Sequence, residues 1–326
     1  MATFEATISV VIPLYGESEH LGEVVAAVRA ELDAAGETWE TLLVDDGSAD
    51  DTWAAIRREA ERVPGVRGVR LSRNFGKEAA VCAGLDAARG EAVIVMDGDL
   101  QHPPQLIGRM IEAWRRGDAD VVEGVKTRHR RQSVVSRICS RPFYWVMRKL
   151  TGFDFASASD YKLLSRPVVA AWLKLGERNL FFRGMVAWLG FRVERIPFEV
   201  APRVGGRTRW TTPRLMKLAL TGMTAYSAAP LRVATVLGAV FFVFAVALGI
   251  QSLWMKFTGR ALTGFTTVIL LQLIIGSLVL LVLGIIGEYL ARIYEEVKGR
   301  PRYIVAETTE APPAGPAEPK SAGDEA

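Results

Sequence analysis

The residues with the clearest chemical potential are two aspartates that flank one glycine, Asp97-Gly98-Asp99. Two carboxylates at this spacing in a loop can turn toward one hard cation, while the glycine lets the backbone approach a ligand. Mg²⁺ binds one or two carboxylates and fills its other positions with substrate phosphates and water, so the motif predicts a metal–diphosphate site. The same residues also form ordinary turns. The apolar run before them and the Gln101-His102-Pro103-Pro104 string after them favour the metal site.

Three further polar clusters each follow a short apolar run. Asp45 ends such a run, where its carboxylate can accept a hydrogen bond from the N–H of a nucleobase. The residues after it also fit a turn that enters a helix. Lys77 can contact a phosphate or be a solvated lysine of a first helical turn. The three clusters are Tyr15-Gly16-Glu17, Asp45-Asp46-Gly47-Ser48 and Arg73-Asn74-Phe75-Gly76-Lys77.

Apolar runs that alternate with amphipathic stretches predict an α/β fold with a βαβ sheet. The first amphipathic stretch predicts a helix that Ser18 caps and Gly36 ends. Ligands of open α/β sheets bind at the carboxyl ends of the strands, so all four polar clusters are expected at one edge. The predicted strands are Ile8–Leu14, Thr41–Val44, Val66–Leu71 and Ala92–Met96, and the third predicted helix covers about 77–89.

The composition argues against several classes of protein. Lys and Arg number 40 against 36 Asp and Glu, and a net charge of +4 is too small for nucleic-acid binding without a concentrated patch. Cys82 and Cys139 have no spacing typical of a disulfide scaffold or a zinc site. The chain has neither a dinucleotide-binding glycine motif after the first strand nor a P-loop. His20, His102 and His129 are scattered, and each is expected to be structural or at the surface.

The apolar residues concentrate toward the C-terminus of the 326-residue chain, which is 50% hydrophobic with a mean hydropathy of +0.18. No charge occurs in the 23 residues from Val233 to Met255 or in the 27 residues from Ala261 to Gly287. Because about 20 residues cross the hydrocarbon core of a bilayer, these runs predict transmembrane helices at about 233–255 and 263–287. A short link makes the pair a hairpin. The alternative is a pair of buried core helices.

Lys and Arg gather on both outer flanks of the hairpin, while the link carries only Lys256 and Arg260. The positive-inside rule therefore predicts that both termini are cytoplasmic, and the expected location is the inner (plasma) membrane, as a multi-pass protein. The N-terminus has no basic region typical of a signal peptide. The predicted parts are a catalytic domain (1–210), an interfacial amphipathic helix or the start of a longer first span (211–232), two transmembrane helices (233–290), and a juxtamembrane segment with a disordered tail (291–326). Glu307 is expected to begin the solvated tail.

Two basic clusters precede the first span. They can grip phosphate groups at the bilayer surface, or reflect only the positive-inside bias and contact with anionic lipid. One contains Lys126, Arg128, Arg130 and Arg131, and the other contains Arg203, Arg207 and Arg209.

Five strings of residues resemble family 2 glycosyltransferases of the polyisoprenyl-phosphate type, which have a catalytic domain similar to dolichol-phosphate mannose synthase and two C-terminal transmembrane helices. The resemblance covers residues 7 to about 303, and Gly16 stands where the family usually has asparagine. The strings are VVIPLYGE (Val10–Glu17), VDDGSADDT (Val44–Thr52), LSRNFGKEAA (Leu71–Ala80), MDGDLQHPP (Met96–Pro104) and RNLFFRGMVAWLGF (Arg178–Phe191).

The resemblance implies a GT-A fold, which is the Rossmann-like fold of nucleotide-diphospho-sugar transferases, with a nucleotide-sugar donor, Mg²⁺ or Mn²⁺, and a lipid-phosphate acceptor. It implies that Asp160 is the acidic residue often proposed as the base. It also implies three groups of binding residues. Pro13, Tyr15, Glu17 and Asp45 would surround the base and ribose; Asp97, Asp99 and Gln101 would hold the metal and diphosphate; Arg128 or Arg131, Arg203 and Arg209 would face phosphates.

Acceptor chemistry bears on the role of Asp160. A phosphate monoester has a second pKa near 6 and is largely dianionic at pH 7, so its oxygen is already a nucleophile and gains little from a base. Asp160 can instead position the sugar or stabilise positive charge at the anomeric carbon. Neutralisation of the departing diphosphate by the metal, which Asp99 is expected to hold at the catalytic site, is then the larger catalytic effect. We expect a single displacement with inversion, which gives a β-linked product from an α-linked donor.

The predicted function is therefore transfer of a hexose from a nucleotide sugar to polyprenyl phosphate at the cytoplasmic membrane face, for glycan or envelope assembly. UDP-glucose is the first expectation for the donor, followed by GDP-mannose or a modified UDP-sugar. A processive polysaccharide synthase is the nearest rival, but it requires a QxxRW string and more spans, and Gly206 stands where the glutamine should be. A catalytically silent membrane scaffold is the other alternative. Copies of the chain can pack together through their two spans.

Overall fold

The computed structural model describes residues 6–99, 101–126, 159–177, 182–198, 229–258 and 264–310. These residues fall into two compact units. One unit is an α/β domain built from the described residues of 6–198 together with 301–310. The other contains the two apolar helices within 229–300.

The α/β domain contains a mixed sheet whose described part has eight strands in the order β7-β5-β6-β4-β1-β2-β3-β8. The four central strands β4, β1, β2 and β3 are parallel, which confirms the predicted βαβ arrangement. β6 is antiparallel to β4 and to β5, and β8 is antiparallel to β3. The strands are β1 Ile8–Leu14, β2 Trp39–Asp45, β3 Val66–Leu71, β4 Ala92–Val95, β5 Val121–Lys126, β6 Lys162–Ser165, β7 Val193–Phe198 and β8 Val305–Thr308.

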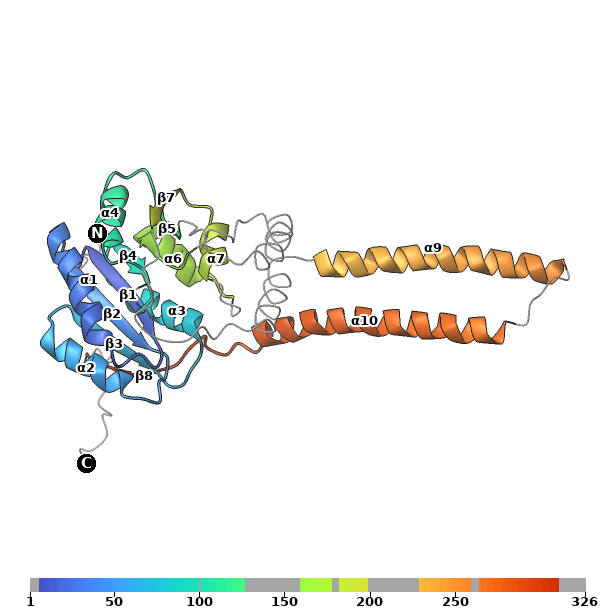
Figure 1. The fold of residues 1–326 in the computed structure, drawn as a ribbon, viewed down its shortest axis with the longest axis horizontal. Helices are drawn as coiled ribbons and strands as arrows, with labels where there is room; N and C mark the ends of the chain where they lie inside the picture. Colours follow the sequence, from blue (N-terminus) through green and yellow to red (C-terminus); the bar gives the residue numbers. More distant parts are fainter. Residues whose placement is uncertain are drawn as a thin grey trace, which may run out of the picture. The chain divides into compact units, whose positions relative to one another are not determined.

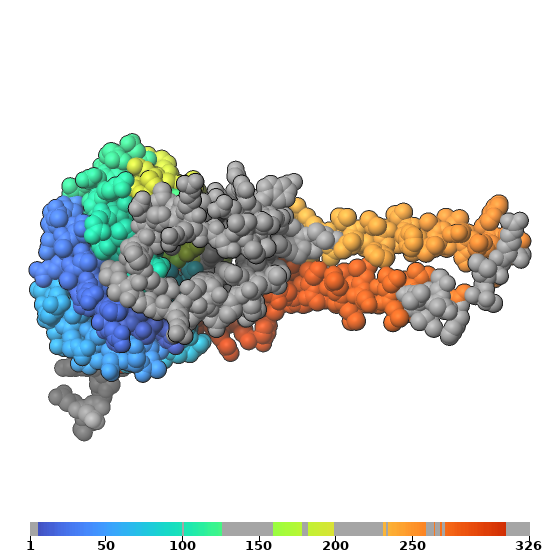
Figure 2. Space-filling model, in the orientation of Figure 1, coloured from blue at the N-terminus to red at the C-terminus, as the bar shows by residue number. Residues whose placement is uncertain are grey.

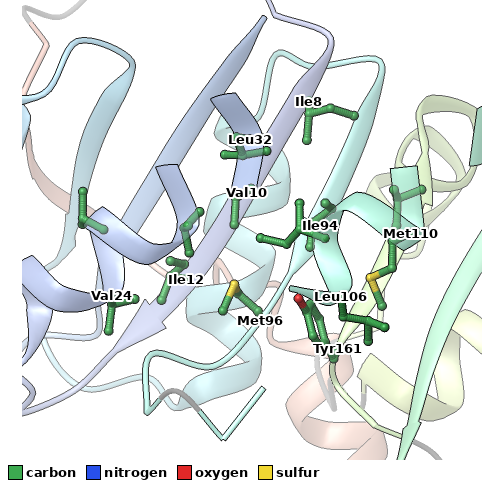
Figure 3. Close-up of a cluster of buried hydrophobic side chains, with 14 of the residues drawn as sticks. Ile8, Val10, Ile12, Val24, Leu32, Ile94, Met96, Leu106, Met110 and Tyr161 are labelled. Atoms are coloured by element: carbon green, nitrogen blue, oxygen red, sulfur yellow. The ribbon is translucent and has the colours of Figure 1, made fainter. Parts of the chain in front are cut away.

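Helices pack on both faces of this sheet because the central strands are apolar on both sides. Alternate β1 side chains such as Val10 join Leu32 of α1 and Met110 of α4 in the main core, and Figure 3 shows this cluster. α3 lies against the same strand from the other side, where a Cβ on Gly84 would stand 2.2 Å from Val11 Cγ1. The helices are α1 Leu21–Ala35, α2 Thr52–Arg62, α3 Lys77–Ala87, α4 Leu106–Arg115, α6 Arg166–Lys174 and α7 Phe182–Trp188.

Of the two residues predicted to delimit α1, only the C-terminal one is confirmed. Gly36 follows the helix with φ 69°, and its N–H donates to Asp33 O at 3.2 Å, so the predicted glycine terminator is confirmed. The prediction that Ser18 caps the helix is wrong. His20 occupies the N-cap without a side-chain hydrogen bond, and Ser18 lies two residues before it.

The segment after the apolar helices returns to the sheet. Val305–Thr308 forms β8 on the outer edge of β3, as Figure 1 shows. The interpretation of Glu307 as the start of a solvated tail is therefore wrong, because its backbone completes a β ladder and its carboxylate binds Trp53. An added strand also covers an edge that would otherwise expose unpaired backbone groups.

The second unit consists of α9 (Ala229–Phe257, 29 residues) and α10 (Phe265–Val297, 33 residues), which lie side by side (Figures 1 and 2). Ala234–Phe257 and Leu271–Val297 are long and apolar enough to cross a membrane, and their side chains are exposed. Together they fit the expected transmembrane hairpin by length and composition. α9 already includes residues 229–232 of the predicted interfacial segment, and the rest of that segment lies outside the described residues.

Candidate active site

The four predicted polar clusters lie at one edge of the sheet because the strands before them are parallel. Leu14 stands opposite Asp45 in the ladder of β1 and β2, and Asp45 stands opposite Arg70 in that of β2 and β3. β6 runs the other way, so it begins where β4 ends, with Lys162 opposite Val95. This antiparallel pairing brings Asp160, just before β6, to the same edge.

Two carboxylates and two cations meet at that edge. Lys77 Nζ lies 2.5 Å from Asp97 Oδ1 and 2.7 Å from Asp160 Oδ2. Arg183 grips Asp160 with two hydrogen bonds, from Nε to Oδ1 at 2.6 Å and from its terminal nitrogen to Oδ2 at 2.9 Å. The Asp160 side chain is only 8% exposed, whereas that of Lys77 is 42% exposed. The cluster therefore presents its cations to an incoming ligand and keeps Asp160 beneath them.

The charges of this cluster fix its ionisation. Burial alone would raise the pKa of Asp160, but the hydrogen bond from Arg183 and the charge of Lys77 outweigh it and hold the pKa well below 3.8. Desolvation would lower the pKa of Lys77, but the charges of Asp97 and Asp160 raise it. The pKa of Arg183 is also raised, because its bond to Asp160 outweighs burial. Asp160 is thus a permanent carboxylate and a weak base.

His102 supports the backbone of the Asp97-Gly98-Asp99 loop. This residue is buried, and its Nδ1 accepts a hydrogen bond from the N–H of Asp97 at 3.1 Å. Its ring stacks on Tyr161 with centroids 4.9 Å apart. Since Nδ1 is an acceptor here, the ring is neutral with its proton on Nε2. His102 is structural, as expected, and it binds the backbone of the first aspartate of the Asp97-Gly98-Asp99 motif.

The two aspartates fit a divalent cation that binds together with a diphosphate. Both supply carboxylate oxygens, and Asp99 Oδ1 accepts a hydrogen bond from the Gln101 N–H at 3.1 Å, which orients that side chain. No cluster of three or more His, Cys, Asp or Glu side chains suited to a metal occurs among the described residues. Two carboxylates leave coordination positions for phosphate oxygens and water, which is the pattern of Mg²⁺ and Mn²⁺ sites.

Gly98 lets this loop approach the loop after β1. A Cβ on Gly98 would lie 2.7 Å from Glu17 Oε2 and 2.6 Å from Leu14 Cδ2. Glu17 is itself fixed, because its N–H donates to Thr52 Oγ1 at 3.1 Å. The loops after β1 and β4 are therefore adjacent, as a ligand that spans both requires.

A second group of residues lies at the ends of β1 and β2. Asp45 is fully buried, and its Oδ1 accepts a hydrogen bond from the Ser48 N–H at 2.9 Å. Ser48 Oγ in turn accepts from the Gly16 N–H at 3.0 Å. Tyr15 is 50% exposed beside this group, whereas Pro13 is buried within β1. The Tyr15 ring is the part of this group open to a ligand.

Asp46 joins the loops after β2 and β3. Its two carboxylate oxygens accept the backbone N–H groups of Phe75 at 2.8 Å and Gly76 at 2.9 Å. Burial raises the pKa of Asp46, and these two bonds oppose the rise. Because Lys77 begins α3 directly after Gly76, Asp46 also fixes where that helix starts.

The structure brings together only part of the predicted site. Lys77, Asp97 and Asp160 are in direct contact, and Glu17, Asp45 and Asp99 lie on the same edge. Arg128, Arg131, Arg203 and Arg209 lie outside the described residues. The sequence reasoning assigned no site role to Arg183, Glu78 or Asp46, although each lies within one of the resembling strings, which were the signal for them.

The ionisation of Glu78 should change the stability of the domain near neutral pH. Its Oε2 accepts the Phe182 N–H at 2.8 Å, and burial followed by the charge of Asp160 raises its pKa to about 7. The folded protein therefore holds this proton up to about pH 7, while the unfolded chain releases it near 4.5. The contribution of Glu78 to the free energy of unfolding is therefore fully present below pH 4.5 and is lost as the pH rises through about 7.

Glu78→Gln keeps an acceptor for the Phe182 N–H but cannot ionise. We expect the variant to match the wild type in melting temperature at pH 5 and to exceed it by several degrees at pH 8. Thermal unfolding followed by circular dichroism across this range checks the result, with the exposed Glu61→Gln as the control. A difference that does not change with pH would contradict the assignment.

Comparisons with known proteins show which proteins this chain is similar to. The family model described as Glycosyl transferase family 2 matches residues 9–170. The uncharacterized glycosyltransferase YkcC of Bacillus subtilis is 36% identical over 299 residues, which cover 91% of this chain and 92% of that protein. Bactoprenol glucosyl transferase of Shigella phage SfII is 35% identical over 303 residues, which cover 91% and 97%. Glucosyl-3-phosphoglycerate synthase from Mycobacterium tuberculosis, solved with Mn²⁺, UDP and phosphoglyceric acid, is 19% identical with a TM-score of 0.47 over 72% of this chain and 78% of its own.

Proposed function

This chain belongs to glycosyl transferase family 2, and from that premise we propose that it transfers a hexose from a nucleotide sugar to polyprenyl phosphate at the cytoplasmic face of a membrane. The observation that carries the proposal is the cluster of Lys77, Asp97, Asp160 and Arg183 at the carboxyl edge of the sheet. Cations beside a two-aspartate motif suit a reaction in which a diphosphate leaves and a phosphate attacks. The bactoprenol glucosyl transferase relative supports glucose and a polyprenyl acceptor.

The donor spans the loops after β1, β2 and β4. Asp45 accepts a hydrogen bond from the base, while Pro13, Tyr15 and Glu17 border the base and ribose. Asp97, Asp99 and Gln101 hold Mg²⁺ or Mn²⁺ with the diphosphate. When bound, the cation neutralises the charge that develops on the departing diphosphate. UDP-glucose is the preferred donor, and GDP-mannose is second.

Lys77 adds a second positive charge to the diphosphate side. Its ammonium is exposed enough to reach a phosphate oxygen, and it already bridges Asp97 and Asp160. A preorganised cation needs no rearrangement of solvent when charge moves onto the leaving group. Lys77 therefore assists departure of the nucleoside diphosphate.

Asp160 acts through its charge and position. Because two cations keep it ionised, it is poorly suited to take a proton, and a dianionic acceptor phosphate has none that must be removed. Its carboxylate instead stabilises positive charge at the anomeric carbon and orients the sugar. The lipid oxygen attacks once, the bond to the diphosphate breaks, and the configuration inverts.

The acceptor approaches from the membrane. α9 and α10 are the two spans of the hairpin, and Arg128, Arg131, Arg203 and Arg209 are the basic residues that face the phosphates. Both termini and the α/β domain lie on the cytoplasmic side, as the distribution of Lys and Arg predicts. A polyprenyl phosphate on this side keeps its chain in the bilayer and presents its phosphate to the cytoplasm.

A transfer assay tests the proposal. Purified full-length protein in detergent is incubated with polyprenyl phosphate and radiolabelled UDP- and GDP-sugars, with and without Mn²⁺. We expect one donor to label the lipid in a metal-dependent way, and Asp99→Asn to abolish the label. Nucleotide binding without lipid labelling by any donor would contradict the lipid acceptor and favour a polysaccharide synthase or a silent scaffold.

A further inference from the structure

Asp45 is a buried carboxylate that pairs with Arg70. Its side chain has 0% exposure, and Arg70 Nε lies 3.4 Å from its Oδ2. Within the part of the chain that the structure describes, this Oδ2 accepts no hydrogen bond, whereas Oδ1 is bound by the Ser48 N–H. Oδ2 is thus paired in charge but retains lone pairs for an N–H of a ligand. The position of Arg70 decides how well that charge is compensated.

Arg70 is held in turn by Glu307 of the C-terminal strand. Arg70 Nη1 donates to Glu307 Oε1 at 3.1 Å, and Glu307 Oε2 accepts the indole N–H of Trp53 at 2.8 Å. Arg70 and Glu307 are also register partners in the ladder of β3 and β8. The Arg70 side chain is 31% exposed and that of Glu307 is 49% exposed, so the chain of charges runs from the surface to the buried Asp45.

We call residues 303–310 the C-terminal strap. Besides Glu307, other residues of the strap also bind the α/β domain, and their contacts do not involve Arg70 or Asp45. Tyr303 OH donates to Asp86 Oδ2 at 2.7 Å, and Thr309 Oγ1 accepts the Gly68 N–H at 2.8 Å. Glu310 contacts Arg67 Nε and the terminal nitrogen of Arg89, each at 2.8 Å. Removing Glu307 alone therefore leaves the strap several attachments to the domain.

We propose that Arg70 and Glu307 are positioning residues for Asp45, so that the strap which follows the membrane hairpin in the chain sets the affinity for the donor nucleotide. The proposal rests on the proposed function, because it requires Asp45 to contact the nucleobase. Losing Glu307 frees the Arg70 guanidinium, and losing Arg70 leaves a buried charge without its partner. Either change disturbs the acceptor that the base uses, without touching Asp97, Asp99 or Asp160.

Calorimetric titration of the full-length protein in detergent with UDP and with GDP, each with Mn²⁺, tests the proposal. For the nucleotide that the wild type binds, Glu307→Ala and Arg70→Met should raise Kd about tenfold, as expected for losing a hydrogen bond to a charged group. Arg70→Lys, which keeps the charge, should recover most of the affinity. In the transfer assay the donor KM should rise, while kcat and the KM for polyprenyl phosphate stay unchanged.

Glu310→Ala is the matched control, because it removes a carboxylate from the same strap that does not contact Arg70. Its Kd should equal that of the wild type. An equal loss in Glu310→Ala and Glu307→Ala would overturn the proposal, since the effect would then come from the strap in general. A loss in Asp45→Ala alone, with Glu307→Ala and Arg70→Met unchanged, would overturn the positioning role and leave the proposed function standing. Unchanged binding in Asp45→Ala would overturn both the proposed role of Asp45 and this inference.

Discussion

Replacing Asp97 with asparagine should lower kcat for sugar transfer by about 10²-fold to 10³-fold, the usual effect of removing one preorganised electrostatic group. The amide keeps the shape of the side chain but loses the charge that a divalent cation needs. It also removes one of the two carboxylates that hold Lys77, whose Nζ lies 2.5 Å from Asp97. Initial rates of lipid labelling at saturating donor and Mn²⁺ measure the effect.

Asp118→Asn makes a suitable control, because Asp118 is an exposed aspartate on the loop after α4. This variant should retain the wild-type rate. Since the His102 contact is to the backbone N–H of Asp97, the Asp97 variant should also keep the wild-type melting temperature to within a few degrees. An Asp97→Asn enzyme with a rate within about threefold of wild type would contradict the assigned role.

Replacing Gly47 with alanine should destabilise the α/β domain by about 2–5 kcal/mol and weaken nucleotide binding. Gly47 has φ +65°, which L side chains rarely adopt, and a Cβ there would lie 2.3 Å from the backbone carbonyl carbon of Arg73. No change of rotamer can relieve this overlap, because the backbone fixes the position of a Cβ and the atom it meets is itself a backbone atom. The loops after β2 and β3 must then separate, although Asp46 joins them through Phe75 and Gly76.

The Gly36→Ala variant separates the cost of the positive φ from the cost of the overlap with Arg73. Gly36 has nearly the same φ of +69°, but no atom lies within 4 Å of its added Cβ. This variant should lose only about 1–2 kcal/mol from backbone strain and should bind nucleotide like the wild type. Denaturant unfolding followed by tryptophan fluorescence compares the pair. Equal losses in the two variants would show that the packing against Arg73 does not matter.

The central strands could be predicted because their signals are local. Ile8–Leu14 and Val66–Leu71 are apolar runs bounded by turn residues, and both strands have the predicted bounds. Once these strands are parallel, their polar ends must share one edge, so the approximate location of Asp45, Lys77 and Asp97 follows. The resemblance supplied Asp160, which no local pattern would have selected.

The features that the sequence did not predict depend mainly on pairings between distant parts of the chain. Nothing near Lys162–Ser165, a strand of four residues, indicates that it pairs antiparallel with β4, yet this pairing places Asp160 beside Lys77. β8 is equally short and continues into a segment rich in Ala, Pro and Glu, so composition favoured a tail. Ser18 has the right type for a cap, but the chain there is held by other contacts, including Glu17 N–H to Thr52.

Determining the structure of the lipid product by NMR and mass spectrometry tests the central claim most directly. Unlabelled UDP-glucose and polyprenyl phosphate are converted by the full-length enzyme with Mn²⁺, and the product is purified. We predict one hexose bonded to the lipid phosphate oxygen in the β configuration, from one displacement on an α-linked donor. An α-linked product would contradict the single displacement, and a sugar attached to anything other than the lipid phosphate would contradict the proposed acceptor.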